Sequence, residues 1–113
     1  MEERRRFPRV QYPCKIIITL EAEPEVFDLT TENISTGGAR VFMPKHFQVN
    51  TPAEIEITID GRVIKTKGRI AWVLKTTALF DTGIEFAHLN PSDREFLNTL
   101  IEDILAKSDE RSE

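Results

Sequence analysis

Two short segments of this sequence carry side chains well suited to holding a small anion. The first contains Arg5 and Arg9, separated by three residues, in a basic stretch at the start of the chain. The second contains Asn33, Ser35 and Gly38, in the spacing Asn-x-Ser-x-x-Gly. An arginine fork can form two parallel hydrogen bonds to a phosphate or another planar acceptor, and short amide and hydroxyl groups add donors and acceptors at close range. The two segments therefore predict a compact anion site.

The charge distribution restricts the kind of anion. Residues 1–15 contain five basic and two acidic residues, a net charge of +3, whereas the whole chain has a net charge of -4. The remainder of the chain therefore carries -7. Because coating of nucleic acid requires an extended basic surface, an acidic body with a short arginine-rich arm favours a small, localised anion site.

Short strands with turns at nearly regular spacing predict a closed or nearly closed antiparallel β-barrel. A chain of 113 residues has room for one such domain. Alternation of apolar and polar residues is clearest at residues 53–60, and Asp60-Gly61 then supplies a tight turn. Six strands are expected. Four lie at residues 14–20, 26–34, 39–43 and 53–60, the fifth returns from the Asp60-Gly61 turn through Leu74, and the sixth lies at about 79–86.

Two features of the later strands bear on where side chains lie. Strict alternation places Trp72 and Leu74 on the same face as Ile64 and Ile70. Gly83 interrupts the last strand, which indicates a bulge or a close approach of another group to the backbone.

A helix is expected after the last strand. Asn90 supplies an oxygen-bearing cap, Pro91 falls near the first turn, and Asp93 complements the helix dipole. Apolar residues then recur at helical spacing and form one stripe. This stripe consists of Phe96, Leu97, Leu100, Ile101, Ile104 and Leu105. The predicted organisation is a flexible basic arm at residues 1–12, a barrel with its helix at 13–107, and a frayed tail at 108–113.

The two polar segments together resemble the signature of the PilZ domain family, in which Arg-x-x-x-Arg is followed, roughly 20 to 30 residues later, by Asp/Asn-x-Ser-x-x-Gly. The blocks ERRRFPRV, ENISTGGARV, GRIAWV and TGIEF are also similar to parts of that family, so the resemblance extends from Glu3 to about Leu105. It implies a mainly-β fold, a six-stranded antiparallel PilZ-type barrel with a C-terminal α-helix, in a bacterial cytoplasmic protein.

The resemblance also implies a ligand, cyclic di-GMP, and no cofactor or metal. Arginine can grip the O6 and N7 acceptors of guanine or pair with a phosphate, while Asn33 and Ser35 can bond base or phosphate groups. Gly38, with Gly37, would allow a positive φ and a close approach of the backbone. The implied site consists of Arg4, Arg5, Arg9, Asn33, Ser35 and Gly38, with Gly37, Arg40 and Trp72 as further candidates. Arg4 resembles the extra arginine of relatives that take the ligand as an intercalated dimer.

The function implied is that of a sensor or adaptor, not an enzyme. Ligand binding would order the arm through Pro8, so that Arg5 and Arg9 close over the nucleotide and a new surface is presented to an effector protein. Regulation of motility or biofilm formation is the expected setting, without membrane insertion and without DNA or RNA as a partner.

Two other functions stay open at this point. One is a PilZ-like adaptor that binds a motility or secretion protein without nucleotide, and the other is a small barrel that binds single-stranded nucleic acid. Catalysis has little support, because the sequence offers Cys14 no identifiable base and pairs no carboxylates for acid–base chemistry. His46 and His88 are far apart and lack neighbouring metal ligands.

Overall fold

A computed structural model of the chain describes residues 8–21 and 25–111. It contains seven strands and one helix, with the strands in a single antiparallel sheet. The strands are β1 (Lys15–Leu20), β2 (Glu25–Thr30), β3 (Asn33–Ile34), β4 (Gly38–Met43), β5 (Pro52–Ile59), β6 (Arg62–Lys75) and β7 (Phe80–Phe86). The helix is α1 (Pro91–Arg111). None of the helices in the described ranges is long and apolar enough to cross a membrane.

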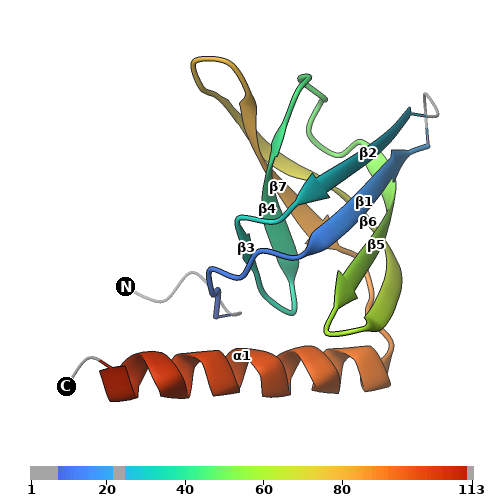
Figure 1. Cartoon of the computed structure of the whole chain (residues 1–113). Coiled ribbons are helices and arrows are strands. Elements are labelled where there is room, and N and C mark those ends of the chain that lie inside the picture. Colours follow the sequence, from blue (N-terminus) through green and yellow to red (C-terminus); the bar gives the residue numbers. More distant parts are fainter. Residues whose placement is uncertain (1–7, 22–24, 112–113) are drawn as a thin grey trace, which may run out of the picture.

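The sheet has the order β2-β1-β5-β6-β7-β4-β3 and is curled into a half-barrel (Figure 1). Since β2 and β3 are consecutive in the chain yet occupy opposite edges of the sheet, the curl must bring these edges near each other. The remaining gap, between β2 and β4, is bridged by side chains. Lys45 lies 2.9 Å from a carboxylate oxygen of Glu25, and the Phe27 and Phe47 rings meet edge to face at 5.6 Å. The predicted mainly-β barrel with a C-terminal helix is confirmed.

The predicted strand at residues 26–34 is wrong, because the chain leaves β1 after Thr30 and pairs instead with β4 from Asn33. Thr31 causes the change of direction. Its side chain is buried, and its hydroxyl accepts a hydrogen bond from the Cys14 backbone N–H at 3.0 Å and donates one to the Tyr12 carbonyl at 2.7 Å. The break therefore adds one short strand to the six expected.

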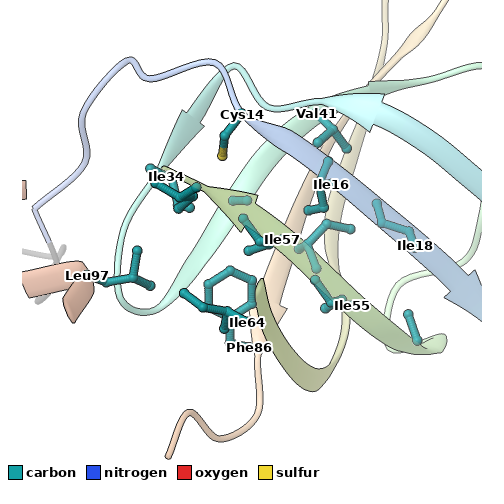
Figure 2. Packing of buried hydrophobic residues seen from close by; sticks show 14 of the residues in the cluster. Cys14, Ile16, Ile18, Ile34, Val41, Ile55, Ile57, Ile64, Phe86 and Leu97 are labelled. Atoms are coloured by element: carbon teal, nitrogen blue, oxygen red, sulfur yellow. The ribbon is translucent and has the colours of Figure 1, made fainter. Parts of the chain in front are cut away.

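Every second residue of a strand points inward, and these side chains fill the barrel interior. On the neighbouring strands β1 and β5, Ile16 pairs with Ile57 and Ile18 pairs with Ile55. Ile57 in turn pairs with Ile64 on β6, and all five are buried. Figure 2 shows these side chains meeting in the barrel interior. Burial of branched side chains from several strands fixes the pairing register, because a shift by one residue would turn each isoleucine outward.

The turn between β5 and β6 matches the prediction. Asp60 and Gly61 both have positive φ, 50° and 82°, as a two-residue hairpin turn of this hand requires. Alternation on β6 is different from that predicted. The register shifts between Ile70 and Trp72, so that Ile70 pairs with the buried Ile84 whereas Trp72 pairs with Gly83. The extra residue at this bulge places Trp72 and Leu74 on the outer face, not the inner face.

Helix α1 lies across one end of the barrel, near the β3–β4 and β5–β6 turns (Figure 1). The predicted cap is present, since the Asp93 backbone N–H donates to the Asn90 side-chain oxygen at 2.8 Å. Arg62, just after the β5–β6 turn, pairs with the Asp93 carboxylate at 2.9 Å and lies 4.8 Å from the centre of the Phe96 ring. The helix continues past Ser108 to Arg111.

The apolar stripe of α1 is buried unevenly. Leu97 and Ile101 are buried in the core cluster, and Phe96, Leu100 and Ile104 are packed against it, but Leu105 is 38% exposed. Leu97 points toward the barrel interior near Ile34 (Figure 2). The stripe is thus covered by the protein's own barrel over most of its length.

Replacing Leu97 by Ala should lower the free energy of unfolding by about 3 kcal/mol, because the substitution leaves a cavity where the helix meets the barrel. Urea denaturation followed by circular dichroism measures this change. Leu105→Ala is the matched control on the same helix and should change stability by less than about 0.5 kcal/mol. Equal effects of the two substitutions would contradict the packing described for α1.

Candidate functional site

The outer face of the sheet carries a row of four residues on four neighbouring strands. Asn33 on β3 pairs with Arg40 on β4, Arg40 pairs with Gly83 on β7, and Gly83 pairs with Trp72 on β6. The row has an outward orientation because the residues beside Arg40 in β4, Ala39 and Val41, are fully buried. Antiparallel register therefore aligns an amide, a guanidinium, a glycine and an indole on one surface.

Gly83 lets the indole of Trp72 lie against the sheet. A Cβ atom at this position would come within 2.8 Å of Trp72 Cδ1 and still closer to Nε1 and Cε2. The predicted close approach to the backbone at Gly83 is therefore confirmed, and the approaching group is the Trp72 ring. The bulge on β6 is what brings this ring to the outer face.

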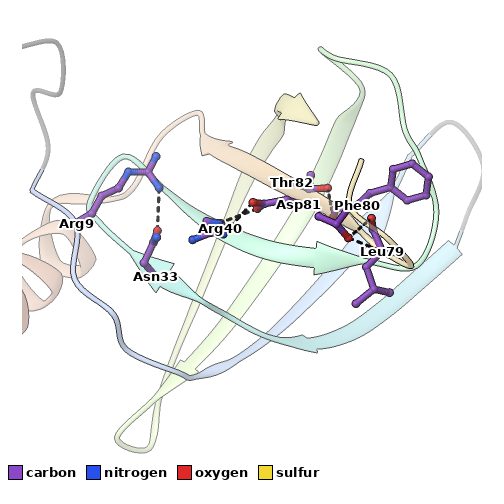
Figure 3. Close-up of polar contacts among 8 residues, drawn as sticks. Arg9, Asn33, Arg40, Leu79, Phe80, Asp81 and Thr82 are labelled. Atoms are coloured by element: carbon purple, nitrogen blue, oxygen red, sulfur yellow. Dashed lines mark hydrogen bonds and ion pairs between the residues drawn. The ribbon is translucent and has the colours of Figure 1, made fainter. Parts of the chain in front are cut away.

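The arm and the turn segment meet at Asn33. Arg9 Nη1 donates a hydrogen bond to Asn33 Oδ1 at 2.9 Å (Figure 3). The backbone beside it is fixed as well, because Val10 and Ile34 exchange two backbone hydrogen bonds of 3.0 and 3.1 Å. Val10 is buried in the core cluster. Arg9 is consequently placed by backbone pairing and core packing of its neighbour, not by its own side chain alone.

Ser35 and the two glycines form the tight turn between β3 and β4. The Ser35 hydroxyl accepts hydrogen bonds from the backbone N–H groups of Gly37 and Gly38, at 3.0 and 3.2 Å. Its own donor position is 3.4 Å from the Gly38 carbonyl, which is a long hydrogen bond. The hydroxyl oxygen therefore orients the turn, while the hydroxyl proton makes only a weak hydrogen bond.

The expected positive φ at Gly37 and Gly38 is wrong, because Gly61 is the one glycine of the described residues that has it. Gly38 is needed for another reason. A Cβ atom there would lie 3.1 Å from the Ile84 carbonyl carbon and 3.3 Å from Glu85 Cα. The glycine thus allows β4 and β7 to pair closely at the start of β4.

Arg40 forms a two-pronged ion pair with Asp81. Its Nε and Nη2 donate to the two carboxylate oxygens at 2.7 and 2.9 Å (Figure 3). Its guanidinium also lies 5.4 Å from the centre of the Phe42 ring. Hydrogen bonding with Asp81 raises the pKa of Arg40 above its ordinary value, and the side chain, like any arginine, is charged at physiological pH.

Two adjoining hollows of about 240 and 360 Å³ lie over this surface. Arg9 and Trp72 line both hollows. The first is completed by Ser35, Gly37, Ala71, Gly83, Ile84 and Glu85, and the second by Val10, Gln11, Asn33, Arg40 and Asp81. Another hollow, of about 390 Å³, lies over β1, β5 and β6 and contains no residue of the two sequence segments.

Comparison with known proteins identifies the family. The family model described as PilZ domain matches residues 3–103, which is most of the chain. The chain belongs to the PilZ family. No curated protein is similar to it in sequence at a significant level.

Solved structures of PilZ proteins share the fold. The motility inhibitor MotI/DgrA of Bacillus subtilis has a TM-score of 0.84 at 18% identity, with 94% of this chain and 53% of that chain covered. YcgR of Escherichia coli in complex with c-di-GMP has a TM-score of 0.78 at 18% identity, with 97% and 50% covered. The PilZ domain of YcgR with c-di-GMP has a TM-score of 0.74 at 16% identity, with 97% and 98% covered. The chain therefore spans about half the length of MotI and of the longer YcgR structure.

The fold brings most of the predicted PilZ site together. Arg9 and Asn33 are hydrogen-bonded, and Ser35, Gly37, Arg40 and Trp72 line the same pair of hollows. Gly38 lies in the adjoining turn, where it supports strand pairing. Arg4 and Arg5 lie outside the described residues. Sequence reasoning missed the partnership of Asp81 with Arg40, because the two residues are 41 positions apart and only the strand register relates them.

The single cysteine of the chain does not lie on this surface. Cys14 is buried inside the barrel, and burial raises the pKa of its thiol although a hydrogen bond with Thr31 acts in the opposite direction. A thiol of raised pKa is a poor nucleophile. Within residues 8–21 and 25–111, His, Cys, Asp and Glu side chains form no group of three or more that could hold a metal ion.

Replacing Gly83 by Ala should displace the indole of Trp72 from the PilZ sheet and destabilise the fold by about 1–3 kcal/mol, because the new methyl group occupies the space of the ring. The chain has a single tryptophan, so its fluorescence reports this position directly. We expect a red-shifted emission and stronger quenching by acrylamide. In the control Gly61→Ala, the added Cβ meets no atom within 4 Å. The positive φ of 82° strains this turn and lowers stability, but the Trp72 emission of the folded variant should match that of the native chain. An unchanged emission in Gly83→Ala would contradict the contact.

Proposed function

We propose that this chain is a receptor for the second messenger cyclic di-GMP. The observation that carries the proposal is the 2.9 Å hydrogen bond between Arg9 and Asn33, which joins the two PilZ sequence motifs at the edge of one surface. Arg9 and Asn33 are 24 positions apart in the chain. The complexes of YcgR with c-di-GMP support the same ligand, since YcgR has the same fold.

The side chains at this surface suit a guanine dinucleotide. Cyclic di-GMP offers two negatively charged phosphates and two guanines, whose O6 and N7 atoms accept parallel hydrogen bonds. In the proposed complex, Arg5 and Arg9 contact these acceptors or the phosphates, and Arg4 adds a further cation. Trp72 supplies a flat apolar surface on which a base can stack.

The turn segment would complete the contacts. Asn33 presents an amide that can accept from the guanine N1 and N2 groups or donate to an acceptor. The Ser35 hydroxyl oxygen lies 3.4 Å from the Gly38 carbonyl oxygen in the present turn, a long hydrogen bond, so its proton can be donated to a phosphate oxygen instead. Gly37 lines the hollow without a side chain, and Gly38 keeps the turn close to β7.

Ligand binding would also order the arm ahead of Pro8. Arg9 is held at the sheet by the pairing of Val10 with Ile34, and Arg5 precedes it by only four positions, so the chain is long enough for Arg5 to reach the same hollows. An ordered arm beside the nucleotide would present a combined surface to an unidentified effector protein. The likeness in fold to the motility inhibitor MotI supports regulation of motility as the setting. Signalling through a partner, with no catalytic step, is the role proposed.

Titration calorimetry with cyclic di-GMP tests the proposed ligand. Arg9→Ala and Arg5→Ala should each weaken binding by roughly 10- to 150-fold, because a hydrogen bond to a charged group contributes about 1.5–3 kcal/mol. Arg94→Ala on helix α1 removes the same side chain from an exposed position and should leave affinity unchanged. Absence of binding heat in the native chain at tens of micromolar ligand would overturn the proposal, and wild-type affinity in both arm variants would overturn the site.

Hydrogen–deuterium exchange tests the ordering of the arm. Peptides from residues 1–8 should exchange more slowly in the presence of saturating cyclic di-GMP, because their backbone amides become protected on the sheet surface. A peptide from β5 serves as the internal control and should exchange at the same rate with and without ligand. Unchanged exchange in the arm, in a sample that binds ligand by calorimetry, would contradict the ordering step.

A further inference from the structure

Arg40 is an additional arginine of the candidate surface and belongs to neither sequence motif. It lines the larger of the two adjoining hollows together with Arg9, Asn33 and Trp72. Its side chain is 35% exposed, whereas that of its partner Asp81 is only 14% exposed. Both side chains line this hollow, and the guanidinium is the more exposed of the two.

The surroundings hold the Arg40 guanidinium in one orientation. Two hydrogen bonds of 2.7 and 2.9 Å tie its Nε and Nη2 to Asp81, and its guanidinium carbon lies over the Phe42 ring, 5.4 Å from the ring centre. Its strand partner is Gly83, and the indole of Trp72 lies over this glycine. Because the rotamers are already fixed, a ligand that contacts Arg40 pays little conformational entropy for it.

The hydrogen bonds to Asp81 determine what else Arg40 can bind. They use Nε and one hydrogen of Nη2, which leaves Nη1 and the second Nη2 hydrogen as a parallel pair of donors. The ion pair as a whole is neutral, and Asp81 would repel a phosphate placed next to it. A neutral group with two adjacent acceptors is therefore a better match than a second anion. The O6 and N7 atoms of guanine are such a group, whereas adenine presents a donor, N6, in place of O6.

We propose that Arg40 contacts the O6/N7 edge of one guanine of the ligand and that Asp81 is a positioning residue, which fixes the arginine fork for this contact. The pair would then determine the preference for guanine over adenine at this surface. This inference rests on the proposed function and adds a specificity role to it.

The test compares the affinities for cyclic di-GMP and cyclic di-AMP, measured by direct calorimetry and by competition against bound cyclic di-GMP. In Arg40→Gln the preference for cyclic di-GMP should fall by about tenfold or more, because one bidentate base contact is lost. Arg40→Lys keeps the charge and should lower the preference as well, since an ammonium cannot form the fork. Asp81→Asn should lower it to a smaller extent, because the guanidinium is less firmly held.

A double variant separates positioning from a merely structural role. If Asp81 acts through Arg40, Asp81→Asn should have no further effect on the preference in a chain that already carries Arg40→Gln. Asp28→Asn is the control, because Asp28 is an exposed strand aspartate that pairs with Lys15 at 3.6 Å and lines none of the hollows described above. It should leave the preference unchanged.

The outcomes distinguish this inference from the proposed function. A native chain that binds cyclic di-GMP, with the same preference in Arg40→Gln and Arg40→Lys, overturns the role of Arg40. An equal loss from Asp81→Asn with and without Arg40→Gln overturns the positioning role of Asp81. A native chain that binds neither dinucleotide overturns the proposed function and the inference with it.

Discussion

The two-residue period of the β-strands is the constraint on which the rest of this structure depends. Along β4 it sends Ala39, Val41 and Met43 into the core and leaves Arg40 outside. The same core packing that stabilises the barrel thus fixes the register of its outer face. Because a slip by one residue would bury Arg40 and expose its neighbours, the candidate surface and the core cannot vary independently.

Within the described strands, the one register shift breaks this period and redirects an aromatic side chain. At Ala71 the extra residue of the β6 bulge reverses the orientation of all later positions, so an aromatic ring that strict alternation would send inward lies on the candidate surface. Gly83 on the neighbouring strand accommodates that ring. Bulges often redirect a side chain beside a binding site. Here the bulge turns the Trp72 ring toward the candidate surface, and the facing glycine leaves room for the ring.

Most of the fold was accessible from the sequence because its signals are local. The alternation of residues 53–60, the Asp60-Gly61 turn and the Asn90 cap are each set by residues close together in the chain. The division of the predicted strand at residues 26–34 was not accessible, because the hydroxyl of Thr31 turns the chain through contacts with Tyr12 and Cys14, which are 19 and 17 positions away.

The candidate site was predictable to a similar degree. The resemblance of both segments to the PilZ signature led to the expectation that Arg9 and Asn33 share a surface, and they are hydrogen-bonded. The side on which Trp72 lies and the partner of Arg40 depend on strand register, which alternation alone does not specify at a bulge. Gly38 shows a third case, in which the residue was identified correctly but the physical reason is strand packing and not backbone φ.

The seam between β2 and β4 has a consequence for how these molecules behave at high concentration. Strand β2 is an edge of the sheet, and unpaired edges can recruit strands from other molecules and lead to aggregation. Here the seam carries the Lys45–Glu25 ion pair, and Asp28 with its partner Lys15 lies further along β2. A strand from another molecule would have to desolvate these charges in order to pair with β2. This desolvation cost protects the edge that backbone hydrogen bonds leave unclosed.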